Sequence, residues 1–262
     1  MSPDPEPLLA VLTVCRDDRP GLLRTHAGLA AQHWRGFAWL VQDGGSRDGT
    51  TALLSTLRDP APDWQSSPDD GPFDGMNRLL QRAAGRFLLF LNAGDAPAEA
   101  TSFARLAAAL AETPQPDLLY GDAWEGTAGG WALKPARSHR RAWAGLFTHH
   151  QAIVYRRALV ADLRYPTVYR IAADYAFTLD ALARAERVRQ VDWPVCRFAG
   201  GGISQRQARL GRREQACIRR AKLGVPAPVD ALITGAQAAS LTLRRRLPDL
   251  YARLRYRGGD AP

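Results

Sequence analysis

The sequence is poor in cysteine and has no long apolar run. Its three cysteines, Cys15, Cys196 and Cys217, lie too far apart to form a metal-binding cluster or a disulfide framework. No stretch approaches the roughly 18 apolar residues that a membrane-spanning helix needs. The first residues lack the basic segment of a signal peptide, and two acids precede the first apolar run. We therefore expect no secretory signal and a reducing, cytoplasmic environment.

Two common phosphate-binding motifs are also missing. No G-x-G-x-x-G segment follows the first predicted strand, and G-x-x-x-x-G-K-[ST] occurs nowhere in the chain. Their absence argues against the usual NAD-binding and P-loop sites.

The net charge of +9 comes wholly from the C-terminal part of the chain. Residues 1–202 hold 22 basic and 22 acidic side chains, whereas residues 203–262 hold 13 basic and 4 acidic ones. Three interpretations of this basic segment stay open: a phosphate-rich partner, peripheral contact with an anionic membrane, and a solvated helical surface. The neutral body lacks the basic and aromatic pattern of a nucleic-acid-binding surface, so we expect no nucleic-acid partner.

Apolar patterns in the first half of the chain alternate between strand and helix. Strands are predicted over 8–16, 37–43 and 86–92, and helices over 22–32, 51–59, 75–85 and 101–113. We expect Gly85 at the C-cap of the third helix, and Thr101 or Ser102 as the cap of the fourth. This alternation predicts an α/β domain with a Rossmann-like, mostly parallel sheet flanked by helices.

The pattern is weaker after about residue 115. We expect a strand over 117–125 with a hairpin partner at 128–135, a strand entering a helix over 152–160, a helix over 174–186, and a strand and glycine turn over 188–204. A basic helical segment follows, broken at Pro226, Pro228 and Pro248. A nucleotide-binding half, 8–115, would thus precede a half that shapes a second ligand's site, 116–204, and an extension, 205–262.

Polar residues follow three of the predicted strands at the point where each strand ends. They lie at Thr13 to Arg16, Asp43 to Ser46 and Asn92 to Asp95. Ligands bind at the carboxyl ends of parallel strands. Carboxylates at this edge suggest Mn²⁺ or Mg²⁺ shared with a diphosphate, because such an ion needs few protein carboxylates when phosphate oxygens and waters complete its shell.

Several motifs, in this order, resemble those of family-2 glycosyltransferases, which have the GT-A fold. They are "TVCRDDRPGLLRT", "VQDGGSRDGT", "SPDDGPFDGMNRLLQRAAGRFLLFLNAGD", "HQAIVYRR", "IAADYAF" and "GGGIS". The resemblance covers about residues 8–204, the expected GT-A domain being 1–204, and is greatest to the branch that builds bacterial surface polysaccharides and glycolipids. It implies inverting, metal-dependent transfer from a nucleotide diphosphate sugar, with UDP-sugar as the expected donor. The acceptor would be a glycan, a lipid-linked molecule or a small molecule with a free hydroxyl.

The resemblance also implies roles for individual residues. Asp95 would be the metal ligand and Asp174 the catalytic base. Contacts to the nucleotide-sugar are implied for Thr13, Cys15, Arg16, Asp43, Asp69, Asp74, Arg78, Asn92, Ala93, Gly94, His150, Gly202, Ser204 and Arg206. Asn92 stands where the family has a carboxylate, so we expect a site that holds its ion tightly only when the nucleotide-sugar is bound.

Structural interpretations stay open for several of these residues. Asp43 could begin an Asx turn, Asp74 and Asp174 could cap helices, and His150 could brace a loop. His149 matches no motif, and we expect no role for it. Two other classes also stay open: a nucleotidyltransferase or other nucleotide-sugar enzyme, and a catalytically silent nucleotide-sugar-binding protein.

Overall fold

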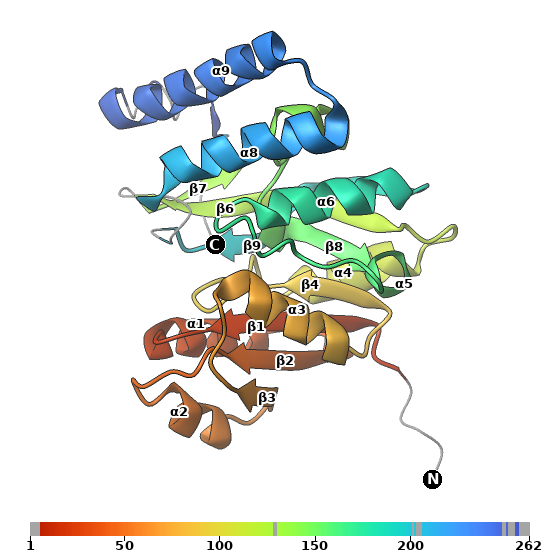
Figure 1. Cartoon of the computed structure of the whole chain (residues 1–262). Helices are drawn as coiled ribbons and strands as arrows, with labels where there is room; N and C mark the ends of the chain where they lie inside the picture. The colour runs from red at the N-terminus through yellow and green to blue at the C-terminus, as the bar shows by residue number, and fades with distance from the viewer. Residues whose placement is uncertain are drawn as a thin grey trace.

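The protein folds around one sheet with helices on both faces (Figure 1). The computed structural model describes residues 6–127, 130–200, 202, 206–247, 250, 255 and 256. Within these residues nine strands form the sheet, in the order β3-β2-β1-β4-β8-β6-β9-β5, and β7 pairs with β6. The predicted fold class is therefore confirmed.

The first half of the chain forms a parallel unit. Its strands are β1 (Leu9–Cys15), β2 (Phe37–Asp43), β3 (Asp63–Ser66) and β4 (Phe87–Phe90). Its helices are α1 (Arg19–Ala30), α2 (Thr50–Thr56), α3 (Pro72–Arg82) and α4 (Ser102–Ala111). All were predicted except β3, which is short, mostly exposed and therefore without an apolar run.

Alternating side chains of β1 build two cores, one on each face of the sheet. Leu12 packs with Met76 of α3 on one face, while Val11 packs with Leu22 of α1 and Phe103 of α4 on the other. Because both faces are covered, the strands read as continuous apolar runs. Each fully buried side chain of this size contributes about 1.5–3 kcal/mol to the stability of the fold.

The second half of the chain adds a mixed part of the sheet. Its strands are β6 (Leu118–Thr127), β7 (Gly130–Lys134), β8 (Ile153–Arg156) and β9 (Val188–Phe198). The short β5 (Ala96–Pro97) of the first half, which was not predicted, pairs with β9. Its helices are α5 (Arg157–Val160) and α6 (Ala173–Arg184), with 3-10 turns η1 (His139–Ala144) and η2 (His150–Ala152). β8 lies antiparallel between β4 and β6, and β6 is parallel to β9. The predicted hairpin and the predicted strand entering a helix are both confirmed.

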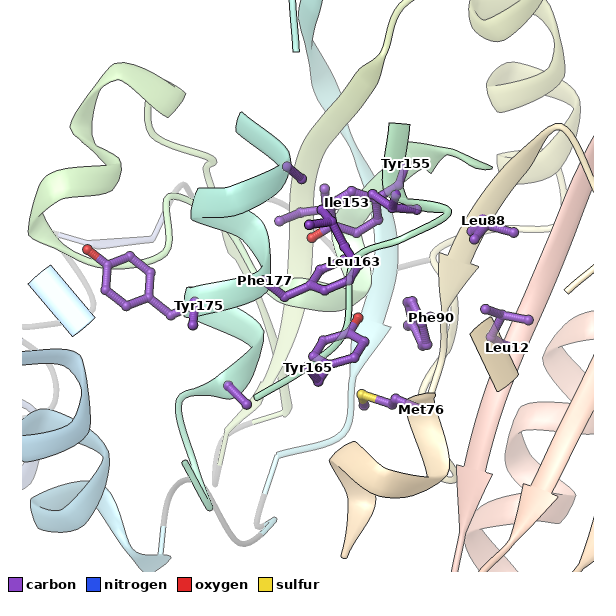
Figure 2. Close-up of a cluster of buried hydrophobic side chains, with 14 of the residues drawn as sticks. Leu12, Met76, Leu88, Phe90, Ile153, Tyr155, Leu163, Tyr165, Tyr175 and Phe177 are labelled. Carbon is purple, nitrogen blue, oxygen red and sulfur yellow. The ribbon is translucent and has the colours of Figure 1, made fainter. Parts of the chain in front are cut away.

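Aromatic rings join the two halves (Figure 2). The ring of Tyr165 stacks on Phe177 of α6, with centroids 4.1 Å apart, and meets the edge of Phe90 of β4 at 5.5 Å. Asn77 of α3 fixes the same loop, because its amide bonds both the backbone N–H and the carbonyl of Tyr165 at 2.8 and 2.9 Å. The two halves of the chain therefore share the core on this face of the sheet.

The predicted basic extension forms two helices, α8 (Ala208–Leu223) and α9 (Ala227–Arg246). Ile218 of α8 is fully buried with the core that contains Phe177. Arg219, also fully buried, donates to Asp230 of α9 at 2.7 Å and to Thr234 at 3.0 Å. No helix in the described part of the chain is long and apolar enough to cross a membrane.

Two local predictions were wrong. Gly85 does not cap α3, which ends at Arg82 with Ala83 at the C-cap. Gly85 is instead needed for close packing, because a Cβ there would lie 2.9 Å from the Cβ of Ala10. Pro228 does not break a helix either: it lies in the first turn of α9, where proline's missing N–H costs nothing.

Asp230→Asn is expected to destabilise the extension. The substitution leaves the guanidinium of Arg219 buried without its carboxylate, which costs about 3 kcal/mol. Asp180→Asn is the matched control, because Asp180 pairs with Lys222 at 2.6 Å with both side chains about one-third exposed, and such pairs contribute at most about 1 kcal/mol. Urea unfolding measures both variants, and equal losses would contradict the expectation.

Candidate active site

The ends of three parallel strands meet at one edge of the sheet. Cys15 is in register with Asp43, and the chain beyond them stays paired, since the N–H of Gly44 donates to the carbonyl of Cys15 at 2.8 Å. On the other side of β1, the N–H of Ala93 donates to the carbonyl of Val14 at 3.1 Å. The structure thus brings the three predicted polar segments together.

Asp43 organises the loop that follows β2. It is fully buried, and its carboxylate accepts from the backbone N–H of Gly45 at 3.2 Å and of Ser46 at 3.0 Å. The hydroxyl groups of Ser46 and Ser66 also donate to it, that of Ser66 at 2.6 Å. These contacts match the Asx-turn interpretation of Asp43 and hold the Gly-Gly loop in one shape.

Arg16 and Asp69 face each other beside this loop. The Arg16 Nη1 lies 3.8 Å from the Asp69 Oδ1, and burial raises the pKa of the Asp69 carboxyl. A Cβ at Gly44 would lie 2.6 Å from the Asp69 carboxylate, so a larger residue there would displace that side chain.

Asp74 and Arg78 form a pair one helical turn apart on α3. Their side chains meet at 2.7 Å, and Arg78 also donates to the hydroxyl of Ser67 at 2.6 Å. Gly71, not Asp74, occupies the N-cap position. The Asp74 carboxylate also accepts from the backbone N–H of Asp70, just before the helix, at 3.3 Å. Asp74 therefore orients Arg78 and also binds a free N–H at the start of α3, although it is not the N-cap residue.

Thr13 and Cys15 present only their backbone at this edge. The Thr13 side chain is fully buried and accepts from the indole N–H of Trp39 at 3.0 Å. Burial raises the pKa of the Cys15 thiol to about 12. Their side chains belong to the core beneath the edge.

Thr25 of α1 holds the turn from Asn92 to Asp95. Its hydroxyl accepts from the N–H of Gly94 at 3.0 Å and donates to the carbonyl of Asp95 at 2.7 Å. Gly94 has φ +98, a conformation that other residues rarely adopt. Thr25 is the last residue of the motif "TVCRDDRPGLLRT", but nothing local predicted these contacts, since they span about seventy residues of chain.

The turn presents two oxygen donors. The Asp95 carboxylate is 4% exposed, accepts from Gln151 Nε2 at 3.0 Å and from the N–H of Ala199 at 3.2 Å, and has its pKa raised to about 7 by burial. The side-chain oxygen of Asn92 is buried, with no hydrogen-bond partner among the described residues. Carboxylate and amide oxygens are donors that Mn²⁺ and Mg²⁺ accept.

These residues fit a divalent cation that takes its remaining ligands from elsewhere. Among the described residues, no group of three or more histidine, cysteine or acidic side chains could hold a metal ion. Asn92 and Asp95 alone would make an incomplete shell, which diphosphate oxygens and waters would fill.

Asp174 lies in the first turn of α6 but does not cap it. Ala172 is the N-cap residue, and the Asp174 carboxylate accepts from the adjacent Tyr175 N–H at 2.7 Å. The N–H groups just before the helix donate to Glu214 of α8 instead, at 2.8 to 2.9 Å. The capping interpretation of Asp174 is therefore wrong. Burial, with a smaller contribution from the charge of Glu214, raises the pKa of Asp174 to about 7.

A cavity of about 810 Å³ is lined by Asp174, His150 and Gln151. Gln151 also donates to Asp95, so one residue links the cavity to the turn after β4. The His150 ring packs against Phe90, and its Nε2 lies 2.8 Å from the hydroxyl of Tyr165. Burial lowers the pKa of His150 to about 4, so the ring is neutral. This geometry matches the loop-bracing interpretation of His150.

Known proteins resemble the chain in sequence. An uncharacterised glycosyltransferase of Mycobacterium tuberculosis is 33% identical over 205 residues, covering 75% of this chain and 77% of its own length. A glycosyltransferase of PGL/p-HBAD biosynthesis in Mycobacterium bovis is 33% identical over 187 residues, 65% of this chain and 64% of its own. The chain belongs to the family-2 glycosyltransferases. No family model matches it.

Solved structures show the same GT-A fold. A mannosyltransferase of Pyrobaculum calidifontis, in complex with GDP-Man and Mn²⁺, matches with a TM-score of 0.66 at 18% identity, over 96% of this chain and 74% of its own. TarS of S. aureus in complex with UDP-GlcNAc gives 0.64 at 19%, over 87% and 70%. Family, fold and enzyme class are thus as predicted, which sets aside the nucleotidyltransferase and silent-protein alternatives.

The remaining predicted residues of this glycosyltransferase lie after β9. Arg206 is exposed, and its backbone N–H donates to the carbonyl of Gly202 at 3.3 Å. Ser204 lies outside the described residues. His149, for which no role was expected, stacks on Phe198 and contacts the buried Glu125 at 3.2 Å beside the cavity.

Thr25→Val is expected to destabilise the glycosyltransferase by about 1–3 kcal/mol, because the buried carbonyl of Asp95 loses its donor and the part-buried N–H of Gly94 loses its acceptor, while the side-chain shape is kept. Thr56→Val, at an exposed hydroxyl that donates to the carbonyl of Leu53, is the control and should change stability by less than about 0.5 kcal/mol. Urea unfolding measures the difference. Equal stability of the two variants would show that Thr25 does not hold the turn.

Proposed function

We propose that the protein is an inverting, metal-dependent glycosyltransferase that moves a sugar from a UDP-sugar to an acceptor hydroxyl. The observation that carries this proposal is the position of Gln151, which bonds Asp95 and lines the cavity of Asp174. The donor would bind along the strand-end edge, and the acceptor would enter the cavity. Gln151 lies where the two would meet.

The donor half of the proposal rests on the loop chemistry at the strand ends. Asp43 ends β2 and Asp69 lies in the loop after β3, and their carboxylates would accept from a nucleobase N–H or a ribose hydroxyl. Arg16 and Arg78 would pair with phosphate oxygens. UDP-GlcNAc is the ligand of the TarS structure, which supports uridine, and GDP-Man is that of the mannosyltransferase. We propose the backbone of Thr13, Cys15, Ala93, Gly94 and Gly202, together with His150, Ser204 and Arg206, as further donor contacts.

Asp95 and Asn92 are proposed to hold Mn²⁺ or Mg²⁺. A bound divalent ion would offset the negative charge that develops on the leaving diphosphate. The protein's own contribution is to orient the Asp95 carboxylate, through the amide of Gln151 and the N–H of Ala199. Mn²⁺ is present in the mannosyltransferase structure, which supports a metal of this type.

Asp174 is proposed as the base of a single displacement. Its carboxylate would take the proton of the acceptor hydroxyl while that oxygen bonds the sugar C1 and the bond from C1 to the diphosphate breaks. Attack from the face opposite the leaving group inverts the anomeric centre. A pKa of about 7 suits this role, because a base works best when its pKa lies near the operating pH.

We propose that residues 1–204 form the GT-A domain and that residues 205–262 form a helical extension packed against it. Its basic surface would support peripheral contact with the anionic inner face of the plasma membrane. A lipid-linked acceptor would fit that location.

Asp95→Ala is expected to lower Mn²⁺-dependent hydrolysis of UDP-sugar at least about 100-fold, because a single lost electrostatic contact to the leaving group has effects of that size. Asp70→Ala, at the exposed acid next to Asp69, should leave the rate unchanged. Asn92→Asp should tighten Mn²⁺ binding without nucleotide, measured by titration calorimetry. An unchanged rate for Asp95→Ala would refute the metal assignment.

Asp174→Asn is expected to lower the transfer rate about 10²- to 10⁴-fold, the usual contribution of a general base. In the wild type the rate should rise with pH through about 7, because the carboxyl accepts a proton only when ionised. The residual rate of the variant should lack that rise. The test is to measure the transfer rates of the wild type and of Asp174→Asn from pH 5.5 to 8.5. A variant rate that still rises with pH would exclude Asp174 as the base.

A further inference from the structure

The cavity of Asp174 has a second wall that the proposed reaction does not use. We call the part of the lining around Asp174, His150 and Gln151 its polar end, and Gln151 there bonds Asp95 at the sheet edge. The apolar part of the lining includes Trp143 of η1 and Ile233 and Leu241 of α9, together with Leu146 and Ile171. The lining is therefore amphipathic.

One face of α9 supplies much of this wall. The lining positions Ile233, Ala236, Gln237, Ser240 and Leu241 follow the spacing of residues that share a helix face. Ala236 and Ser240 are exposed although they line the cavity, so small side chains there leave the space open. This face of α9 therefore borders an open space and does not pack closely against other elements.

The wall is fixed in place by specific contacts. Gln237 donates to the carbonyl of Ala144 and to Gln215 Oε1, both at 2.9 Å, which ties α9 to η1 and α8. Glu214 ties α8 to the start of α6, directly beside Asp174. The cavity is preformed, and its volume lies within the range of small-molecule sites, about 300–1,000 Å³.

The basic residues at the polar end are engaged by the protein itself. Lys134 contacts the buried carboxylate of Glu125 at 2.9 Å, and Arg137 donates to the carbonyl of Leu146 at 2.6 Å. Lys134 is thus paired with a carboxylate, whereas Arg212 and Arg255 also line the cavity and add positive charge. The lining therefore combines charged side chains with an apolar wall, which suits an amphiphilic ligand.

We propose that this cavity binds the hydrophobic aglycone of the acceptor. The acceptor is an amphiphile, whose hydroxyl reaches Asp174 while its alkyl or aryl part lies between Trp143 and α9. A sugar ring alone would leave the apolar wall unused, since its hydroxyls need polar partners. The inference rests on the proposed function, because it places the reacting hydroxyl at Asp174.

The test uses the full chain and a neutral apolar dye, N-phenyl-1-naphthylamine, whose fluorescence rises when it is bound. The dye should bind, and octyl β-glucoside should displace it at least about tenfold more strongly than methyl β-glucoside, because only the former has an apolar chain to bury. Ala236→Trp and Ser240→Trp fill the cavity and should weaken dye binding at least about tenfold. Ala239→Trp, on the same helix outside the cavity, should not.

Two filling variants guard against misfolding of either one, and circular dichroism checks each fold. Equal dye affinity in the filled variants and in Ala239→Trp, equal displacement by both glucosides, or no dye binding would overturn the aglycone site. Dye binding needs no donor, metal or ionised Asp174. Normal dye results with unimpaired Asp174→Asn activity would instead overturn the proposed function alone.

Discussion

The backbone pairing of β1 with β2 and β4 fixes where every proposed donor-binding residue lies. Cys15 is in register with Asp43, and the hydrogen bonds of Gly44 and Ala93 to β1 extend that pairing past the strand ends. A slip of one residue would turn Asp43 to the other face of the sheet. The apolar side chains that alternate along β1, Leu12 to one face and Val11 to the other, prevent that slip because both faces are buried.

Asp174 depends on a different and more distant support. Glu214, forty residues later in the chain, accepts the N–H groups that precede α6 and raises the pKa of Asp174 by its charge. Arg219 and Asp230 in turn hold α9 against α8. The extension is therefore joined by hydrogen bonds to the start of α6, which carries the proposed catalytic base. The two helices of the extension also line the cavity beside it. Stability and acceptor recognition are coupled through this unit.

The sequence predicted what depends on local pattern. Apolar runs gave the strands, and the polar residues at their ends, such as Asp43 and Asp95, were expected at one edge. It did not predict contacts made by the fold: the partners of Thr25 and Glu214 lie far away in the chain, and Glu214 belongs to none of the motifs. Gly85 was misassigned because its packing against Ala10 is visible only when β1 is in place. Local sequence patterns thus predicted where the site lies, whereas the contacts that hold its residues in place are visible only in the tertiary structure.

One physical effect acts on both proposed reaction carboxylates. Burial raises the pKa of Asp95 and of Asp174 to about 7. In the proposed reaction, the two carboxyls differ in which groups offset the unfavourable effect of burial on their ionised form. A cation beside Asp95 would favour its ionised form. Asp174 instead accepts from the backbone N–H groups of Tyr175 and of its own residue, and it faces the negative charge of Glu214. Asp95 would therefore stay ionised as a ligand, while Asp174 would keep the proton affinity that a base requires.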